Sequence, residues 1–202
     1  MAEFAHGGPE FNGKDEDVLK VIGDEGLSVF TFDGLRRITG SHPETLSRTL
    51  DRLEENGLVV RSPDGYVLTG KGRGSARLRQ AADAGGRVPI LHTFLPHGAS
   101  PRTIASALKG RWFDRMRWVG MAESEEGVVM KWVTEDGGAM IDVKMSAGQL
   151  DVEAKLVDGE GLAEAVRAAH QLMGRVSKLY SSPRQGGRHL LMQIGYFTPY
   201  AM

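Results

Sequence analysis

The first third of the chain places apolar residues at helical spacing, most regularly across residues 43–56. Three leucines there are separated by four and three positions, so they share one helical face: Leu46, Leu50 and Leu53. Ser41 precedes the pattern and can accept a backbone N–H bond of the first turn. Gly57 follows it and suits a left-handed helix end. The pattern predicts a helix that is capped by Ser41 and ended by Gly57.

Shorter elements surround this helix. Downstream, two β-rich runs are separated by the letters SPDG, which have the composition of a β-turn. Upstream, apolar spacing predicts two helices with a short β-rich run between them. In chain order, the predicted elements are a helix over 14–24, a strand over 27–30, a helix that is capped by Thr31 and ends near Gly40, the helix over 43–56, and strands over 58–60 and 66–68.

The face opposite the leucines carries polar residues at positions i, i+3, i+4 and i+7: Thr45, Arg48, Thr49 and Arg52. A helix in a DNA groove uses such residues, because arginine binds guanine or phosphate oxygens and threonine contacts base edges or phosphates. The other interpretation is a solvated face, with the arginines paired to acidic residues of the same helix: Asp51, Glu54 or Glu55.

The segment PETLSRTLDRLEENGLVVRSPDGYVLTGKGRG resembles the winged helix-turn-helix of MarR- and ArsR-like prokaryotic or archaeal transcriptional regulators. Its most specific pieces are RLEENGLV at the helix exit and YVLTGKG at the exit from the wing. The resemblance implies a recognition helix over 43–56 and a wing over 58–68. It also implies that Thr45, Arg48, Thr49 and Arg52 face the major groove and that Arg61 lies near the minor groove. Winged helices also act as protein-interaction modules, so that alternative stays open.

Charge is distributed unevenly although the 202-residue chain has a formal net charge of only −1. Residues 61–87 hold six cations against Asp64 and Asp83. The cations are Arg61, Lys71, Arg73, Arg77, Arg79 and Arg87. A basic segment directly after the wing suits phosphate attraction, so Lys71, Arg73 and Arg77 are further expected DNA contacts.

Composition narrows the class of protein further. The absence of cysteine excludes disulfides, cysteine zinc fingers and thiol catalysis. No apolar run approaches the roughly 20 residues that span a bilayer, and no signal peptide opens the chain. We therefore expect a cytoplasmic protein with no membrane partner. Residues 1–13 are glycine-rich and suggest a flexible arm, and residues 14–84 then form the winged-helix domain.

Gly85-Gly86 marks a predicted domain boundary. Residues 88–202, which follow it, have a different pattern of apolar residues. Short turn-forming gaps between apolar runs indicate antiparallel hairpins. The pattern predicts an α+β domain of order β-α-β-β-β-β-α, with one antiparallel sheet and helices on one of its faces. The predicted elements are strands over 88–95, 116–121, 128–133, 140–145 and 150–156, a helix after Ser100 and a long helix over 161–180.

This order could also indicate a half-saddle like that of TATA-binding protein, which would make the sheet a nucleic-acid surface. Alternation places three lysines and three carboxylates on the polar face of the strands: Lys131, Lys144 and Lys155 with Asp142, Asp151 and Glu153. Such a face pairs charges across strands and does not attract a polyanion. We therefore expect an effector or dimerisation domain, in which a small-molecule effector could bind.

Enzymatic signals are weak. His92, His97 and His170 lack the spacing and the supporting ligands of a metal site, and no catalytic constellation stands out. We expect no enzyme activity, metal or cofactor, although an unrecognised enzyme in residues 88–202 remains an alternative. The apolar run over 190–197 predicts a strand that joins the sheet or a partner subunit. The sequence thus predicts a homodimeric, sequence-specific binder of double-stranded DNA that regulates transcription.

Overall fold

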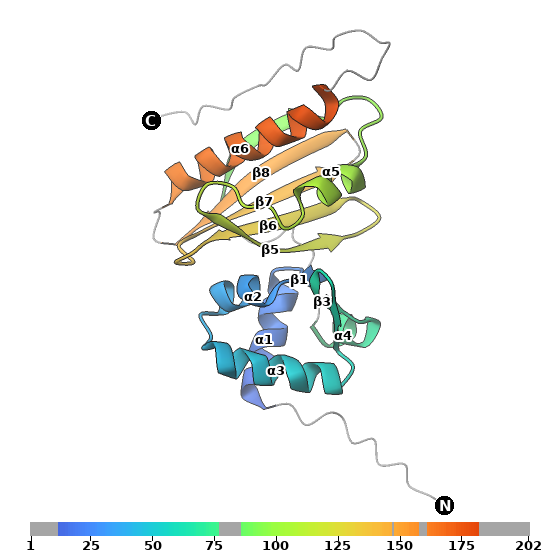
Figure 1. The fold of residues 1–202 in the computed structure, drawn as a ribbon, viewed down its shortest axis with the longest axis vertical. Helices are drawn as coiled ribbons and strands as arrows, with labels where there is room; N and C mark the ends of the chain where they lie inside the picture. The colour runs from blue at the N-terminus through green and yellow to red at the C-terminus, as the bar shows by residue number, and fades with distance from the viewer. Residues whose placement is uncertain (1–11, 77–85, 147, 158–160, 182–202) are drawn as a thin grey trace, which may run out of the picture.

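The computed structural model describes residues 12–76, 86–146, 148–157 and 161–181. Over these residues the protein has six helices and eight strands, and the strands form one antiparallel sheet. Figure 1 shows the N-terminal elements packed below the C-terminal sheet and its helices. None of the helices in these residues is long and apolar enough to cross a membrane. The predicted α+β class is confirmed.

The N-terminal part follows the predicted order of elements. These are α1 (Gly13–Asp24), β1 (Val29–Phe30), α2 (Phe32–Thr39), α3 (Pro43–Glu55), β2 (Val59–Ser62), β3 (Gly65–Leu68) and α4 (Gly70–Ala76). The Asn12 side chain caps α1 by accepting the Asp15 backbone N–H at 3.0 Å, and the Asp15 carboxylate accepts the Asn12 backbone N–H. Residues 12–13 are therefore ordered by a capping box, whereas residues 1–11 of the predicted arm lie outside the described residues.

Helix α3 begins at Pro43 as predicted, but its cap differs from the prediction. Its N-cap residue is His42, and no side chain caps the first turn, so the predicted Ser41 cap is wrong. The reason is Pro43, which restricts the preceding residue to extended backbone; His42 has φ −63° and ψ 138°. The predicted core face is confirmed, because all three of its leucines are fully buried: Leu46, Leu50 and Leu53.

The C-terminal part has the predicted β-α-β-β-β-β-α order. Its elements are β4 (Arg87–Phe94), α5 (Pro101–Leu108), β5 (Met116–Glu123), β6 (Val128–Thr134), β7 (Ala139–Ser146), β8 (Gln149–Leu156) and α6 (Leu162–Ser181). Helix α6 covers the sheet through small and apolar side chains that are buried: Ala165, Ala168, Ala169, Leu172, Met173 and Val176. Leu162 and Val166 of the predicted stripe stay exposed. Most of the predicted apolar stripe therefore packs on the sheet.

One sheet runs through both parts of the protein in the order β2-β3-β1-β5-β6-β7-β8-β4. The two-residue strand β1 makes the connection, because Val29 pairs with Val67 of β3 on one side and Met121 of β5 on the other. The backbones approach closely there. A Cβ atom on Gly120 would lie 2.3 Å from the Val29 carbonyl oxygen, so this position requires glycine.

Helices cover both faces of the sheet, not one face as the sequence suggested. Helices α5 and α6 pack on one face, and α2 contacts β5 and β6 on the other. Val119, Val133 and Met140 of the sheet consequently belong to the core of the N-terminal part. The physical reason is that these three residues make part of the polar face apolar, which gives the N-terminal helices a surface to bury.

Candidate nucleic-acid interface

Helix α3 lies at the end of the molecule opposite the C-terminal sheet (Figure 1), so one of its sides faces outward. Thr45 is half-buried on this helix. The Arg48 side chain is 71% exposed and donates from Nη2 to Glu44 Oε1 at 2.6 Å. Glu44 is also mostly exposed, so the pair is solvated and contributes little to stability. Arg48 can therefore exchange this partner for another anion.

The other two predicted groove residues of α3 do not lie freely on that surface. Thr49 is fully buried, and Arg52 is held by the carboxylate of Asp15 in α1. Arg52 donates from Nη2 to Asp15 Oδ1 at 2.5 Å and from Nε to Asp15 Oδ2 at 3.1 Å. It also donates to Thr49 Oγ1 at 3.1 Å. The predicted contact of Thr49 with DNA is therefore corrected, because α1 covers this side of α3.

Asp15 is the buried member of this ion pair, with a side chain that is only 2% exposed. Burial by itself raises the pKa of the carboxyl group, because it disfavours the charged form. The hydrogen bond from Arg52 and the backbone N–H of Asn12 outweigh burial and hold the pKa of Asp15 below its ordinary value. The carboxylate therefore stays ionised and ties α3 to the start of α1.

Arg61 on β2 turns back toward α3 and forms ion pairs with Asp51 and Glu54. Its Nε atom lies 3.1 Å from Glu54 Oε2, and its guanidinium carbon lies 5.9 Å from the centre of the Tyr66 ring. Two of the three carboxylates that the sequence offered to Arg48 and Arg52, Asp51 and Glu54, thus pair with Arg61. The side chain remains 57% exposed beside the outward side of α3.

The tip of the β2–β3 hairpin packs against the C-terminal part. Lys109, just after α5, donates from Nζ to Asp64 Oδ2 at 2.5 Å. Gly65 lies so close to β1 that a Cβ atom would be 2.4 Å from the Phe30 carbonyl oxygen. The hairpin tip is therefore anchored, and the part of the predicted wing that stays near α3 is the region around Arg61.

Helix α4 supplies two of the remaining predicted cations. Lys71 is exposed and donates from Nζ to the Asn56 carbonyl oxygen at 2.8 Å, at the C-terminal end of α3. Arg73 is also exposed, two positions further along the same short helix. Arg77, the last predicted contact, lies outside the described residues. The structure thus places Arg48, Arg61 and Lys71 around α3 but separates Thr49 from that surface.

A buried ionic cluster joins the two parts of the protein. Asp142 and Lys131, both 0% exposed, pair at 2.7 Å between Asp142 Oδ2 and Lys131 Nζ, and Arg87 also binds Asp142. Glu25, which follows α1, accepts from Lys131 at 3.1 Å and from Lys155 at 3.0 Å. The sequence predicted that lysines and carboxylates pair across this face of the sheet, but not that Glu25 and Arg87 join them, since neither residue lies in a motif.

The pKa of Glu25 reflects this position. Burial raises the pKa of the carboxyl group, but the charges of Lys131 and Lys155 and their hydrogen bonds outweigh it and lower the pKa below the ordinary value. Glu25 therefore remains a carboxylate at neutral pH. It links α1 to β6 and β8 by an interaction that weakens as the medium becomes acidic.

Comparison of the chain with models of protein families, with curated proteins and with solved structures gave no match.

Proposed function

We propose that the N-terminal part is a winged helix-turn-helix, and that the protein binds double-stranded DNA sequence-specifically as a transcriptional regulator. The observation that carries this proposal is the outward placement of α3 after α2, with Arg48 exposed and Arg61 and Lys71 beside the C-terminal half of the helix. Helix α3 is the proposed recognition helix. Thr45 and Arg48 are its proposed major-groove residues, and Arg61, Lys71 and Arg73 are proposed to contact phosphates.

The interaction energies favour a change of partner for Arg48, from Glu44 to guanine. Its exposed pair with Glu44 is worth about 0.2–1 kcal/mol, whereas a bidentate arginine contact with guanine is worth about 1–3 kcal/mol. Arg52 has a different role in this proposal, because its Nε and Nη2 groups already donate hydrogen bonds to Asp15. In this proposal Arg52 fixes the orientation of α3 against α1 and does not contact the bases.

We expect Arg48→Ala to weaken binding by about 1–3 kcal/mol, which is the value of a specific base contact. The fold should be unaffected, because the side chain is mostly exposed. The measurement is a titration of the full chain with duplexes that it selects from a random library. Arg102→Ala is the matched control: it also removes an exposed arginine from an ion pair, on α5. Equal affinity of both folded variants would contradict the groove assignment.

The alternative is a winged-helix module that binds another protein, and the charge of α3 favours it specifically. The helix holds two arginines against four carboxylates: Glu44, Asp51, Glu54 and Glu55. Binding to random duplex over a range of salt concentrations separates the two functions. DNA binding predicts an affinity that falls with salt, with a slope of roughly 0.9 per phosphate contact. No measurable affinity for duplex at low salt would favour the protein-binding alternative.

We also propose a homodimer, because one short recognition helix reads few base pairs and two copies can read both halves of a palindromic site. The apolar run over 190–197, which the sequence suggested as the seam, lies outside the described residues. Sedimentation of the full chain and of a chain ending at residue 183 tests this proposal. We expect the full chain to be dimeric at micromolar concentration and the shortened chain to be monomeric. A monomeric full chain would refute the dimer, and a dimeric shortened chain would move the seam elsewhere, with exposed Leu162 and Val166 of α6 as the next candidates.

A further inference from the structure

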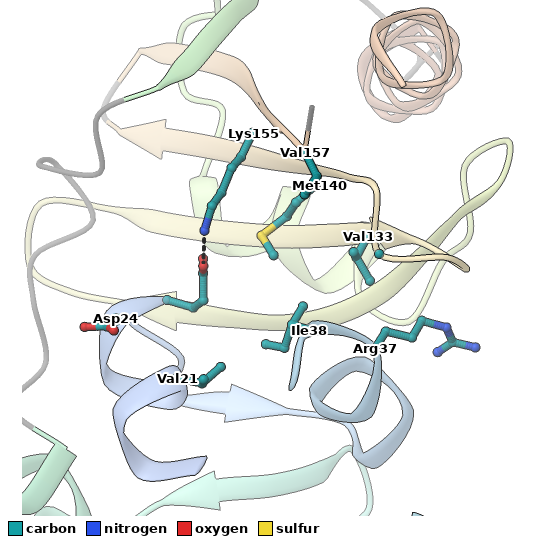
Figure 2. A pocket seen from close by; sticks show the side chains of 10 residues that line it. Val21, Asp24, Arg37, Ile38, Val133, Met140, Lys155 and Val157 are labelled. Atoms are coloured by element: carbon teal, nitrogen blue, oxygen red, sulfur yellow. Dashed lines mark hydrogen bonds and ion pairs between the residues drawn. The ribbon is translucent and has the colours of Figure 1, made fainter. Parts of the chain in front are cut away.

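A cavity of about 280 Å³ lies between the helices of the N-terminal part and the C-terminal sheet. Figure 2 shows its lining from close by. Residues of α1, α2, β6, β7 and β8 contribute to it, together with residues just after α1 and β8: Val21, Asp24, Glu25, Arg37, Ile38, Val133, Gly137, Met140, Lys155 and Val157. The volume is near the lower end of ligand pockets, which start at about 300 Å³, so it suits a small metabolite.

Apolar side chains line the cavity on both sides, between the charged residues of the lining. Val21 and Ile38 extend from the helices, and Val133 and Met140 face them from the sheet (Figure 2). All four residues belong to, or pack against, the core of the N-terminal part. Val157 at the sheet end is 52% exposed, so solvent reaches the cavity from that side. A hydrocarbon group that enters there would leave water for a surface formed by both parts of the protein.

One cation is directed toward this apolar space. Lys155 reaches across the sheet, and its Nζ atom donates to Glu25 Oε1 at 3.0 Å (Figure 2). An ammonium group has three N–H donors, and the Lys155 side chain is 47% exposed, so donors remain for a further acceptor. Figure 2 shows Asp24 and Arg37 at opposite ends of the lining, directed away from Lys155.

The charge balance around the cavity favours an anion. Three cations and two carboxylates form the ionic cluster beside it: Arg87, Lys131 and Lys155 with Glu25 and Asp142. Asp24 and Arg37 have opposite charges and leave this balance unchanged. One positive charge is therefore not compensated within this group. A single negative charge placed beside Lys155 would balance it in partly desolvated surroundings, where Coulomb attraction is stronger than in water.

We infer that this cavity binds a small aliphatic monocarboxylate. Its carboxylate accepts from Lys155, and its hydrocarbon chain lies between Ile38 and Met140. The bound acid contacts both parts of the protein, so it stabilises the arrangement in which α1 and α2 rest on the sheet. The binding site stands without the proposed DNA-binding function. Only an effect of the acid on DNA affinity rests on that function.

The test uses the full chain and straight-chain acids from butanoate to octanoate, with hexanamide as the neutral match of hexanoate. We expect calorimetry to show binding of at least one acid at millimolar concentration or below, and at least tenfold weaker binding of the matching amide. The same acid should raise the unfolding temperature. Failure of every acid to bind, or equal binding of acid and amide, would overturn the inference.

Two variants locate the site. Lys155→Gln should weaken binding of the acid at least tenfold, whereas Lys144→Gln should not change it, because Lys144 pairs with Glu153 away from the cavity. Ile38→Phe fills the apolar end without altering any charge and should also weaken binding at least tenfold. Unchanged binding in both Lys155→Gln and Ile38→Phe would place the ligand elsewhere and overturn the assignment. All these measurements omit DNA, so they are independent of the outcome of the DNA-binding experiments.

Discussion

Asp142→Asn is expected to lower the free energy of unfolding by about 3–5 kcal/mol, the range for loss of one partner from a buried ion pair. Asp142 is 0% exposed and is the carboxylate that both Lys131 and Arg87 bind. The substitution keeps the size of the side chain but removes its charge. Glu25 would then be the only carboxylate of the cluster, facing three cations. The measurement is urea unfolding at neutral pH.

The control for this prediction is Glu153→Gln on the neighbouring strand. Glu153 pairs with Lys144 at 2.7 Å, but both side chains are more than a quarter exposed, so the loss should be at most about 1 kcal/mol. The double variant Asp142→Leu with Lys131→Met should recover much of the loss, because apolar replacement of a buried pair removes the unpaired charge. A similar small loss for Asp142→Asn and Glu153→Gln would mean that water reaches the cluster.

Local structure was predictable from the sequence because it depends on neighbouring residues. The leucine spacing predicted the buried face of α3, and the short turn-forming gaps between apolar runs predicted the antiparallel pairing of β5 to β8, but not the pairing of β4 with β8. The letters SPDG predicted the turn between β2 and β3, which the structure confirms. The Ser41 cap was a local error, which arose because Pro43 fixes the start of the helix more strongly than a serine hydroxyl does.

The sequence could not predict what packs against the polar side of α3 or the polar face of the sheet, because the packing partners are far away along the chain. Helical spacing separates the leucine side of α3 from its polar side, but it does not show that α1 covers Thr49 and Arg52 on the polar side. Alternation likewise places Lys131 and Asp142 on the polar face of the sheet, yet Glu25, 106 residues before Lys131, helps to bury them. The cavity arises at the same junction and has no motif of its own.

Arg52→Met is expected to lower the free energy of unfolding by about 1–3 kcal/mol at neutral pH, the range for leaving a buried acceptor without its partner. Methionine keeps most of the apolar stem but removes both hydrogen bonds to Asp15, whose side chain is 2% exposed. Arg48→Met on the same helix is the control, because it removes an exposed arginine. Its effect on stability should stay within about 0.5 kcal/mol.

The stability difference between the wild type and Arg52→Met should depend on pH. In the wild type the pKa of Asp15 lies below its ordinary value of about 3.9, so the pair stabilises the fold above that pH. This contribution is lost as the pH falls through the folded pKa, because a protonated Asp15 gains nothing from Arg52. The difference should therefore be full near pH 7 and shrink near pH 3. Equal differences at both values would mean that Arg52 acts through its packing and not through Asp15.

Arg52→Met also separates the two roles that this arginine could have in DNA binding. If Arg52 orients α3 from behind, the folded variant should bind selected duplexes nearly as well as the wild type in mild conditions, and affinity should fall only where the variant unfolds. Arg48→Met should show the opposite result, with a stable fold and weaker binding. Loss of affinity by a folded Arg52→Met protein, equal to that of Arg48→Met, would show that Arg52 leaves Asp15 to contact the DNA.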